Sequence, residues 1–530
     1  MNPKIFPVDI WSAKQLGIEE WQENFFWPVS DEEYVQLCQD VLSVWRQRID
    51  AEPQHVGDAF LVKSNIVTDC QHELHALWVL QRLAESGHRP LYTERSLWYR
   101  RLSEHSTEEA VDVPVNRMVN ECTLPRSLFF LRAIKRAIRA WRFNLSAGKM
   151  YSASTVYVFG VPSGMVAEYA KSLPEWVHLS YQEDWLAHDS ATSAFDEKTA
   201  RDAASAFVSE MVERARQRGI VVSDAHQRRF ISRVAGELLD ASETLERMSS
   251  RVAQKGRVHV LTPTLNDPFA RSLAIQVRAH GGSVTGFAHG GSIGMFDTPF
   301  LSMSEFALAD EFMTYTEASV SLFQELHDRY ASPRNHRTQI RSAHSNLFRR
   351  AWDDGQRQVT PTSIKRVMLL GFPYNPWRKP QSPGGLALLH VDMERRLVNA
   401  LSQQGYEVLY KVHPDRREEA AGIFDDKAHV VLGEFRDCVD QADAIVIGSL
   451  RTTALPYALC TQKPVIALSI HGDTLMHAEA KAVLQQRCVL LETDFDDRNR
   501  IIPPIEALVK ALQKPFVAPQ ADFIEQYLIP

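Results

Sequence analysis

Two stretches decide the fold: Glu407-Val-Leu-Tyr-Lys-Val-His-Pro414 and Ala444-Ile-Val-Ile-Gly-Ser-Leu-Arg-Thr-Thr453. Each begins as a short, mostly apolar run rich in β-branched residues, which is typical of a buried strand, and each ends in a polar loop. Similar apolar runs alternate with helical patterns. The runs lie at 366–370, 429–432 and 465–468, and the helical patterns lie at 388–404 and 454–460. This alternation predicts a doubly wound parallel sheet over residues 346–515.

A second region, at 151–345, shows the same alternation. Its expected strands lie at 154–161, 176–180, 258–262 and 283–288. The chain is therefore expected to be an α/β protein of two Rossmann-like, doubly wound domains that face a cleft. Residues 1–150 are interpreted as a helical N-terminal region packed on the first domain, and residues 516–530 as a C-terminal segment.

The bulk composition limits the class of protein. The chain has 530 residues, 45% of them hydrophobic and 24% charged, with a net charge of −7. That length favours two domains, and the lack of a basic surplus argues against a nucleic-acid partner. Six scattered cysteines fit no zinc or redox spacing, so we expect a reduced, cytoplasmic protein without a metal site. No apolar run reaches the roughly 18 residues of a transmembrane helix.

The loop after the second stretch carries groups suited to a phosphate. Ser449, Thr452 and Thr453 supply hydroxyls, and Arg451 supplies a fixed positive charge. The loop also opens a predicted helix, whose free N–H groups favour an anion. Simple capping of that helix by a hydroxyl is the alternative.

The loop after the first stretch offers a histidine. Pro414 disfavours a helix at His413 and holds it extended beyond the strand end, where its ring can donate to a phosphate oxygen. A histidine that is merely packed at a strand end is the alternative. Ligands bind beyond the carboxyl ends of parallel strands, so neighbouring residues complete the predicted nucleotide-binding set. These are Lys411, Gly371, Tyr374 and Glu434.

Together these loops resemble those of GT-B glycosyltransferases of the HP-motif type. The resemblance rests on Lys411-Val-His-Pro414, Gln441-Ala-Asp-Ala-Ile-Val-Ile-Gly-Ser449 and Ala458-Leu-Cys-Thr-Gln-Lys-Pro-Val465, and it covers about residues 364–470. Such enzymes use CMP- or CDP-linked donors, and they include bacterial sialyltransferases, Kdo transferases and teichoic-acid glycerophosphotransferases. The resemblance implies that His413 and Ser449 contact the donor phosphate, with Glu434 or its loop near the nucleoside. The family often has two adjacent small hydroxyl residues where this chain has Ser449 and Leu450.

The catalytic group is expected to come from the first domain. His289 follows a predicted strand in a glycine-rich block, 287–295, and is a candidate general base. Asp267, beyond the strand at 258–262, is a candidate base or nucleophile. Glu183 and Asp184 are further candidates. A glycine-rich turn with an incidental histidine, and solvated loop carboxylates, are the alternatives.

These observations predict a glycosyltransferase that moves an acidic sugar, such as Kdo or a nonulosonate, from a CMP-sugar to a bacterial surface glycan or glycolipid. No cofactor beyond the donor is expected. One alternative is a UDP-sugar 2-epimerase, which usually has Ser-Gly-Gly and a helix glutamate where this chain has Leu450-Arg451-Thr452 and no glutamate in 454–460. Another is a non-catalytic, nucleotide-binding glycan-assembly protein.

The segment 128–143 bears on the partner. Leu131, Ile134, Ile138 and Trp141 share one face of a predicted helix that is otherwise rich in arginine and lysine. Such a helix could lie on an anionic bilayer, giving peripheral contact with the inner face of the cytoplasmic membrane. A core-packed helix with a solvated basic face is the alternative.

Overall fold

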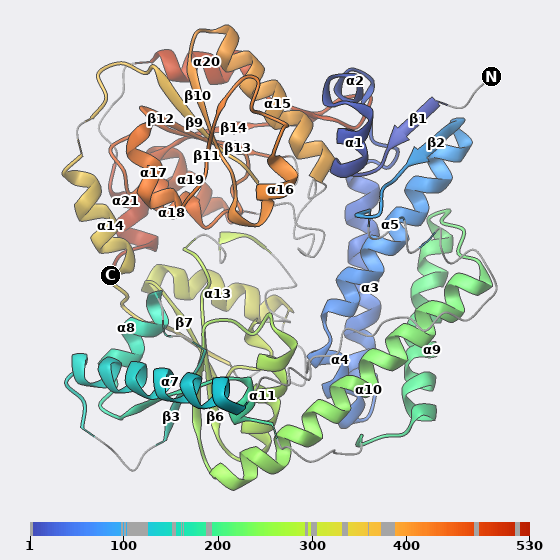
Figure 1. Cartoon of the computed structure of the whole chain (residues 1–530), viewed down its shortest axis with the longest axis vertical. Coiled ribbons are helices and arrows are strands. Elements are labelled where there is room, and N and C mark those ends of the chain that lie inside the picture. Colours follow the sequence, from blue (N-terminus) through green and yellow to red (C-terminus); the bar gives the residue numbers. More distant parts are fainter. Residues whose placement is uncertain are drawn as a thin grey trace.

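The computed structural model shows an α/β chain with two parallel sheets (Figure 1). It describes residues 4–96, 99, 102, 126–150, 155–160, 162, 164–186, 193–291, 295–297, 305–330, 338–358, 360–372, 387–470, 476–514 and 520–530.

The second sheet has six parallel strands in the order β11-β10-β9-β12-β13-β14. The strands are β9 (Arg366–Leu370), β10 (Glu407–Lys411), β11 (His429–Val431), β12 (Ala444–Ile447), β13 (Val465–Ser469) and β14 (Val489–Glu492). Every residue of β12 and β13 is buried, because helices cover both faces of a parallel sheet. The helices of this domain are α15 (Ala387–Gln403), α16 (Arg417–Ala420), α17 (Phe435–Cys438), α18 (Ala454–Leu459), α19 (Ala478–Arg487) and α20 (Ile505–Gln513).

The first sheet also has six parallel strands, in the order β4-β3-β5-β6-β7-β8. They are β3 (Val156–Phe159), β4 (Val177–Ser180), β5 (His259–Thr262), β6 (Ser283–Phe287), β7 (Glu311–Thr314) and β8 (Gln339–Ser342). Its helices include α7 (Arg126–Ser146), α8 (Gly164–Ser172), α11 (Pro268–Ala279) and α13 (Glu317–Tyr330). The predicted fold class, two doubly wound α/β domains with a helical N-terminal extension, is confirmed.

The N-terminal extension is a strand pair and a set of helices. Its elements are β1 (Lys4–Pro7), α1 (Ile10–Leu16), α2 (Ile18–Asn24), α3 (Asp31–Ala51), α4 (Gln54–Val62), α5 (Asn65–Glu85) and β2 (His88–Leu91). A capping box of Ser30 and Glu33 starts α3. The helices α9 (Glu197–Gln217) and α10 (Asp224–Lys255) pack on α3 and α4 to complete this layer.

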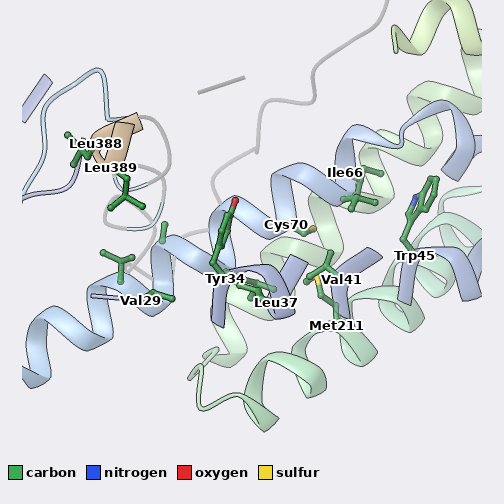
Figure 2. Close-up of a cluster of buried hydrophobic side chains, with 14 of the residues drawn as sticks. Val29, Tyr34, Leu37, Val41, Trp45, Ile66, Cys70, Met211, Leu388 and Leu389 are labelled. Carbon is green, nitrogen blue, oxygen red and sulfur yellow. The ribbon is translucent and has the colours of Figure 1, made fainter. Parts of the chain in front are cut away.

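This extension contacts both domains, including the first domain, on which the sequence predicts that residues 1–150 pack. In one continuous apolar cluster, Tyr34 and Leu37 of α3 share the core with Met211 of α9 and with Leu388 and Leu389 of α15 (Figure 2). The long helices α3 and α5 span the distance between the two domains (Figure 1). One end of each lies near α1, beside the second domain, and the other end lies near α4, beside the first domain. A pattern of apolar residues predicts which face of a helix is buried, but it does not predict which other element packs against that face.

Two further helices link the domains. The helix α14 (Leu347–Gln356) follows the first sheet and packs on α18, and α21 (Asp522–Tyr527) packs on both α13 and α19. Two short strands, β15 (Asp494–Phe495) and β16 (Ile501–Ile502), form a separate antiparallel pair. Of the helices that the structure describes, none is long and apolar enough to span a bilayer.

Candidate functional site at the facing strand ends

The carboxyl ends of the two sheets face each other. Beyond β6, Phe296 forms an antiparallel bridge with Met476, which lies beyond β13 of the other sheet. The backbone N–H of His477 donates to the Met295 carbonyl at 2.9 Å. Beyond β12, the Arg451 guanidinium lies 5.0 Å from the centre of the Phe296 ring. Loops that follow strands of both sheets therefore meet, and Arg451 is the predicted site residue that these contacts place at the junction.

In the second sheet, the strand order reverses between β9 and β12. Such a switch point separates the loops that follow the two strands and is the usual ligand site of an open parallel sheet. Here those loops begin at Gly371 and at Gly448. A Cβ on Gly371 would lie 2.5 Å from the Tyr410 hydroxyl, so only glycine fits this strand end. The sequence prediction places the phosphate loop, 448–453, on one side of this switch point.

A buried polar network, centred on Glu394 and Arg416, supports the loops at this switch point. Glu394 of α15 accepts hydrogen bonds from the Phe372 N–H at 2.8 Å and from the Tyr410 hydroxyl at 2.7 Å. Arg416 Nη1 donates to the Phe372 carbonyl at 2.7 Å and lies 3.2 Å from Glu394 Oε2. Both charged side chains are fully buried. Burial raises the pKa of Glu394, and the charge of Arg416 opposes that rise.

This network also fixes the histidine turn. The Arg416 N–H donates to the His413 carbonyl at 2.9 Å, closing a short 3-10 helix, Pro414–Arg416, directly after the strand. The side chain of Arg416 is the anchor of that turn. The sequence motifs do not indicate Arg416 or Glu394 as part of the site. The signal was a glutamate on the apolar face of helix 388–404, because a charge there requires a buried partner.

The predicted phosphate ligands of the first stretch lie in different environments. The ring of His413 is half-buried, and Pro414 is exposed. Lys411 is buried, its Nζ donates to the Val412 carbonyl at 2.7 Å, and burial lowers its pKa. Glu434 is exposed at the start of α17, where its charge acts on Lys411. Tyr374 lies outside the described residues.

Some polar groups of the 448–453 loop form hydrogen bonds with the backbone of the loop and of the adjoining Ala454. The Ser449 Oγ is buried and accepts from the Arg451 N–H at 3.4 Å. The Thr452 Oγ1 accepts from the Ala454 N–H at 3.3 Å in a local turn. The N-cap residue of α18 is Thr453, whose side chain makes no capping hydrogen bond. Thr453 is exposed. The helix that follows, α18, has only 6 residues, which is under two turns.

A comparable buried polar network supports the loop after β5 in the first sheet. Glu305, which is buried, accepts from the Leu265 N–H at 2.9 Å, from Thr264 Oγ1 at 2.9 Å and from Asn266 Nδ2 at 2.5 Å. These residues form the loop after β5, and the strand order of this sheet reverses between β3 and β5. Buried Arg271 donates to the Leu265 and Asn266 carbonyls and so fixes the same loop. A buried carboxylate thus supports the switch point of each sheet.

The candidate bases lie on the loops around this network. His289 is exposed after β6, and it is near enough to Glu305 that its charge lowers the pKa of that carboxyl, although burial raises it overall. Asp267 is exposed and caps α11, with Oδ1 accepting from the Phe269 N–H at 2.7 Å. Asp184 instead forms two hydrogen bonds with Arg136, at 2.7 and 2.9 Å, and the exposed Glu183 lies beside them.

Among the described residues, no cluster of histidine, cysteine and carboxylate side chains has the arrangement of a metal site. The polar groups on the strand-end loops are instead hydroxyls, backbone N–H groups, a histidine and an arginine in the second domain, and a histidine and carboxylates in the first. Such a set can bind an anion on one side and accept a proton on the other.

Comparison with known proteins gives coarse likeness only. No protein-family model and no curated protein sequence matches this chain. The solved UDP-GlcNAc 2-epimerase of Methanocaldococcus jannaschii, in complex with UDP-GlcNAc and UDP, is similar at 10% identity over 70% of this chain and 95% of its own, with a TM-score of 0.38. Os79 from O. sativa, in complex with UDP, is similar at 11% identity over 68% of this chain and 90% of its own, with a TM-score of 0.37. Likeness at this level says nothing about the substrate.

Proposed function

We propose that this chain is a nucleotide-sugar-dependent glycosyltransferase whose donor binds at the switch point of the second sheet. The observation that carries the proposal is the meeting of strand-end loops from two parallel sheets. In this proposal, the loops of the second sheet supply the phosphate-binding groups, and the loops of the first sheet supply the candidate proton acceptors. Transfer between two substrates needs both kinds of group in one binding site, because the leaving phosphate belongs to the donor and the attacking hydroxyl belongs to the acceptor.

The donor in this proposal is a CMP-linked acidic sugar, such as Kdo or a nonulosonate. The resemblance of the 411–414 and 441–449 motifs to HP-motif enzymes supports this choice. His413 and Ser449 bind the phosphate, Arg451 adds positive charge near it, and the leaving CMP is stabilised without a cation. The network of Glu394 and Arg416 holds these loops in place, so the charges are oriented before the substrate arrives.

The acceptor in this proposal is a glycan or glycolipid of the bacterial surface, modified at the cytoplasmic side. His289 removes the proton from its attacking hydroxyl, and Asp267 is the second candidate for that role. One oxygen of Asp267 is already engaged in capping α11, which favours His289 as the base. Glu305 acts through the loops beside His289 and does not itself need to touch the substrate.

A thermal-shift panel of CMP, CDP, UDP, GDP and ADP tests the donor class. A ligand that binds only the folded chain stabilises it by about 2.7 kcal/mol at 100 times its dissociation constant. We expect CMP and CDP to raise the melting midpoint, and UDP, GDP and ADP to leave it unchanged. A shift with UDP but not with CMP contradicts the CMP-sugar proposal and favours a UDP-sugar enzyme such as the epimerase.

Substitution of His413 tests the site. His413→Ala is expected to abolish the CMP shift while leaving the midpoint without nucleotide close to that of the unmodified chain. The matched control is His429→Ala, because His429 is exposed in the same domain but begins β11 beside Leu409, in the middle of β10, and does not follow a strand end. A CMP shift that survives His413→Ala shows that His413 is structural.

A further inference from the structure

The helix α7 binds the first domain through a polar face. Arg136 pairs with Asp184 through two hydrogen bonds, as described above. About two turns further on, buried Asn144 accepts from the Val177 N–H at 2.9 Å and donates to the Val177 carbonyl at 2.8 Å. Val177 lies on β4, an edge strand, so Asn144 satisfies backbone groups that the sheet leaves open. Ala140 and Phe143 are partly buried on the same side.

The opposite face of α7 is apolar and exposed. The exposed fractions are 41% for Ile134, 46% for Ile138, 57% for Trp141 and 49% for Leu145. Their spacing of three or four residues puts them in one stripe along the helix. Five of the eleven large hydrophobic residues exposed in the described chain lie between 134 and 150, the fifth being Met150. The core-packed alternative is therefore wrong for Ile134, Ile138 and Trp141, whose side chains point away from the core because the helix is attached by its polar face. The side chain of Leu131 lies outside the described residues.

A basic flank adjoins the apolar stripe. At about 100° per residue, Lys135, Arg139 and Arg142 lie together on one side of the helix, between the stripe and the attached face. All three are exposed. The acidic residues near α7, Asp184 and Glu183, instead face Arg136 on the attached side. The outer surface of α7 therefore combines apolar side chains with positive charge.

We propose that this surface of α7 binds an anionic lipid bilayer, with the helix lying parallel to the membrane plane. The apolar stripe enters the boundary between headgroups and acyl chains, where tryptophan is favoured, and the basic flank contacts lipid phosphates. A bilayer suits this surface better than a protein partner because apolar side chains and positive charge lie side by side along one helix, and lipids can rearrange around them. The helix α7 lies on the edge strand β4 of the first sheet (Figure 1). The proposal does not depend on the transferase chemistry.

Sedimentation with vesicles tests this surface. The probes are vesicles of phosphatidylcholine alone and vesicles in which phosphatidylglycerol makes up roughly one third of the lipid. The full chain is expected to bind the anionic vesicles, more weakly as salt is raised, and to bind neutral vesicles far less. Absence of binding to the anionic vesicles, or equal binding to both, overturns the proposal.

Two variants separate the stripe from the flank. Ile138→Ser with Trp141→Ser is expected to abolish binding. Arg139→Gln with Arg142→Gln is expected to weaken it about 25-fold, because each basic residue near an anionic surface contributes about fivefold. The control pair is Arg214→Gln with Arg228→Gln, which neutralises exposed arginines on α9 and α10 and is expected to change nothing.

Light scattering without lipid distinguishes a second copy of the chain as the occupant. A dimer that is lost in the Ile138 and Trp141 variant, together with unchanged vesicle binding, overturns the membrane proposal. Because all these substitutions are at exposed positions, the far-UV circular dichroism and melting midpoint are expected to stay those of the unmodified chain. No nucleotide or sugar is present in the assay, so its failure leaves the transferase proposal unaffected.

Discussion

The buried pair beneath the second switch point gives a quantitative prediction of stability. Arg416→Met keeps much of the aliphatic volume but removes the positive charge, leaving the fully buried Glu394 without its counter-ion. Breaking a buried ion pair from one side costs about 3–5 kcal/mol. The Tyr410 hydroxyl and the Phe372 N–H still donate to Glu394, at 2.7 and 2.8 Å. The expected loss is therefore near the lower end, about 3 kcal/mol.

The loss should depend on pH. Burial already raises the pKa of Glu394, and the charge of Arg416 opposes that rise, so its removal raises the pKa further. A carboxyl whose pKa is higher in the folded than in the unfolded chain is stabilising below its unfolded pKa, and that contribution is lost as the pH rises through the folded pKa. Arg416→Met should therefore be closer to the unmodified chain at pH 5 than at pH 8.

Urea unfolding at both pH values measures this effect. Tryptophan fluorescence and circular dichroism should be followed together, because a free energy can be read from a chain of two domains only where the transitions coincide. At a slope of about 3 kcal/mol per molar urea, a loss of about 3 kcal/mol lowers the midpoint by about 1 M. The control is Arg417→Met, since Arg417 is the exposed neighbour. A loss at Arg416 that is below about 1 kcal/mol, or no larger than at Arg417, refutes the reasoning.

Three further changes have distinct expected outcomes. Burial raises the pKa of Glu419 to about 7, so its stabilising contribution is lost as the pH rises through 7; Glu419→Gln should match the unmodified chain in thermal melting at pH 5 and be more stable at pH 8. In a transfer assay, His289→Ala should lower the rate at least about 100-fold, whereas Asp267→Asn, which preserves the cap of α11, should change it less than about tenfold; the reverse order makes Asp267 the base. Gly371→Ala places a Cβ 2.5 Å from the Tyr410 hydroxyl and should lower the free energy of unfolding, measured with urea, by about 1–3 kcal/mol. An unchanged free energy of unfolding would show that the residues around this strand end move apart without cost.

The regular elements were accessible from the sequence because their signals are local. The strand predicted at 176–180 is observed at Val177–Ser180, and the helices predicted at 388–404 and 454–460 are observed at Ala387–Gln403 and Ala454–Leu459. The strand-end loops could likewise be located in advance, because each begins where an apolar run ends. The roles of His413, Ser449 and His289 stay predictions, since phosphate binding and proton transfer depend on a substrate.

Other parts of the site could not be predicted. Glu305 and Asn266 are 39 positions apart in the sequence, and Arg416 and Glu394 are 22 apart. No periodic pattern links such residues, because buried polar pairs form wherever tertiary packing brings two charges into a space without water. Likewise, Ser449 and Thr452 looked like free phosphate ligands, but both hydroxyls accept hydrogen bonds from their own loop.

The opening stretches, 407–414 and 444–453, by themselves determined that this chain contains a parallel sheet with polar loops at its ligand-binding edge. Alternation of apolar strands and amphipathic helices is enough for that, because burial of both sheet faces imposes it. Tertiary structure alone decided which loops of the two sheets touch, that a buried carboxylate supports each switch point, and that α7 turns its apolar face outward. The reason is that a helix pattern specifies two faces, and only the available partners, here Asp184 and Val177, select which face is attached.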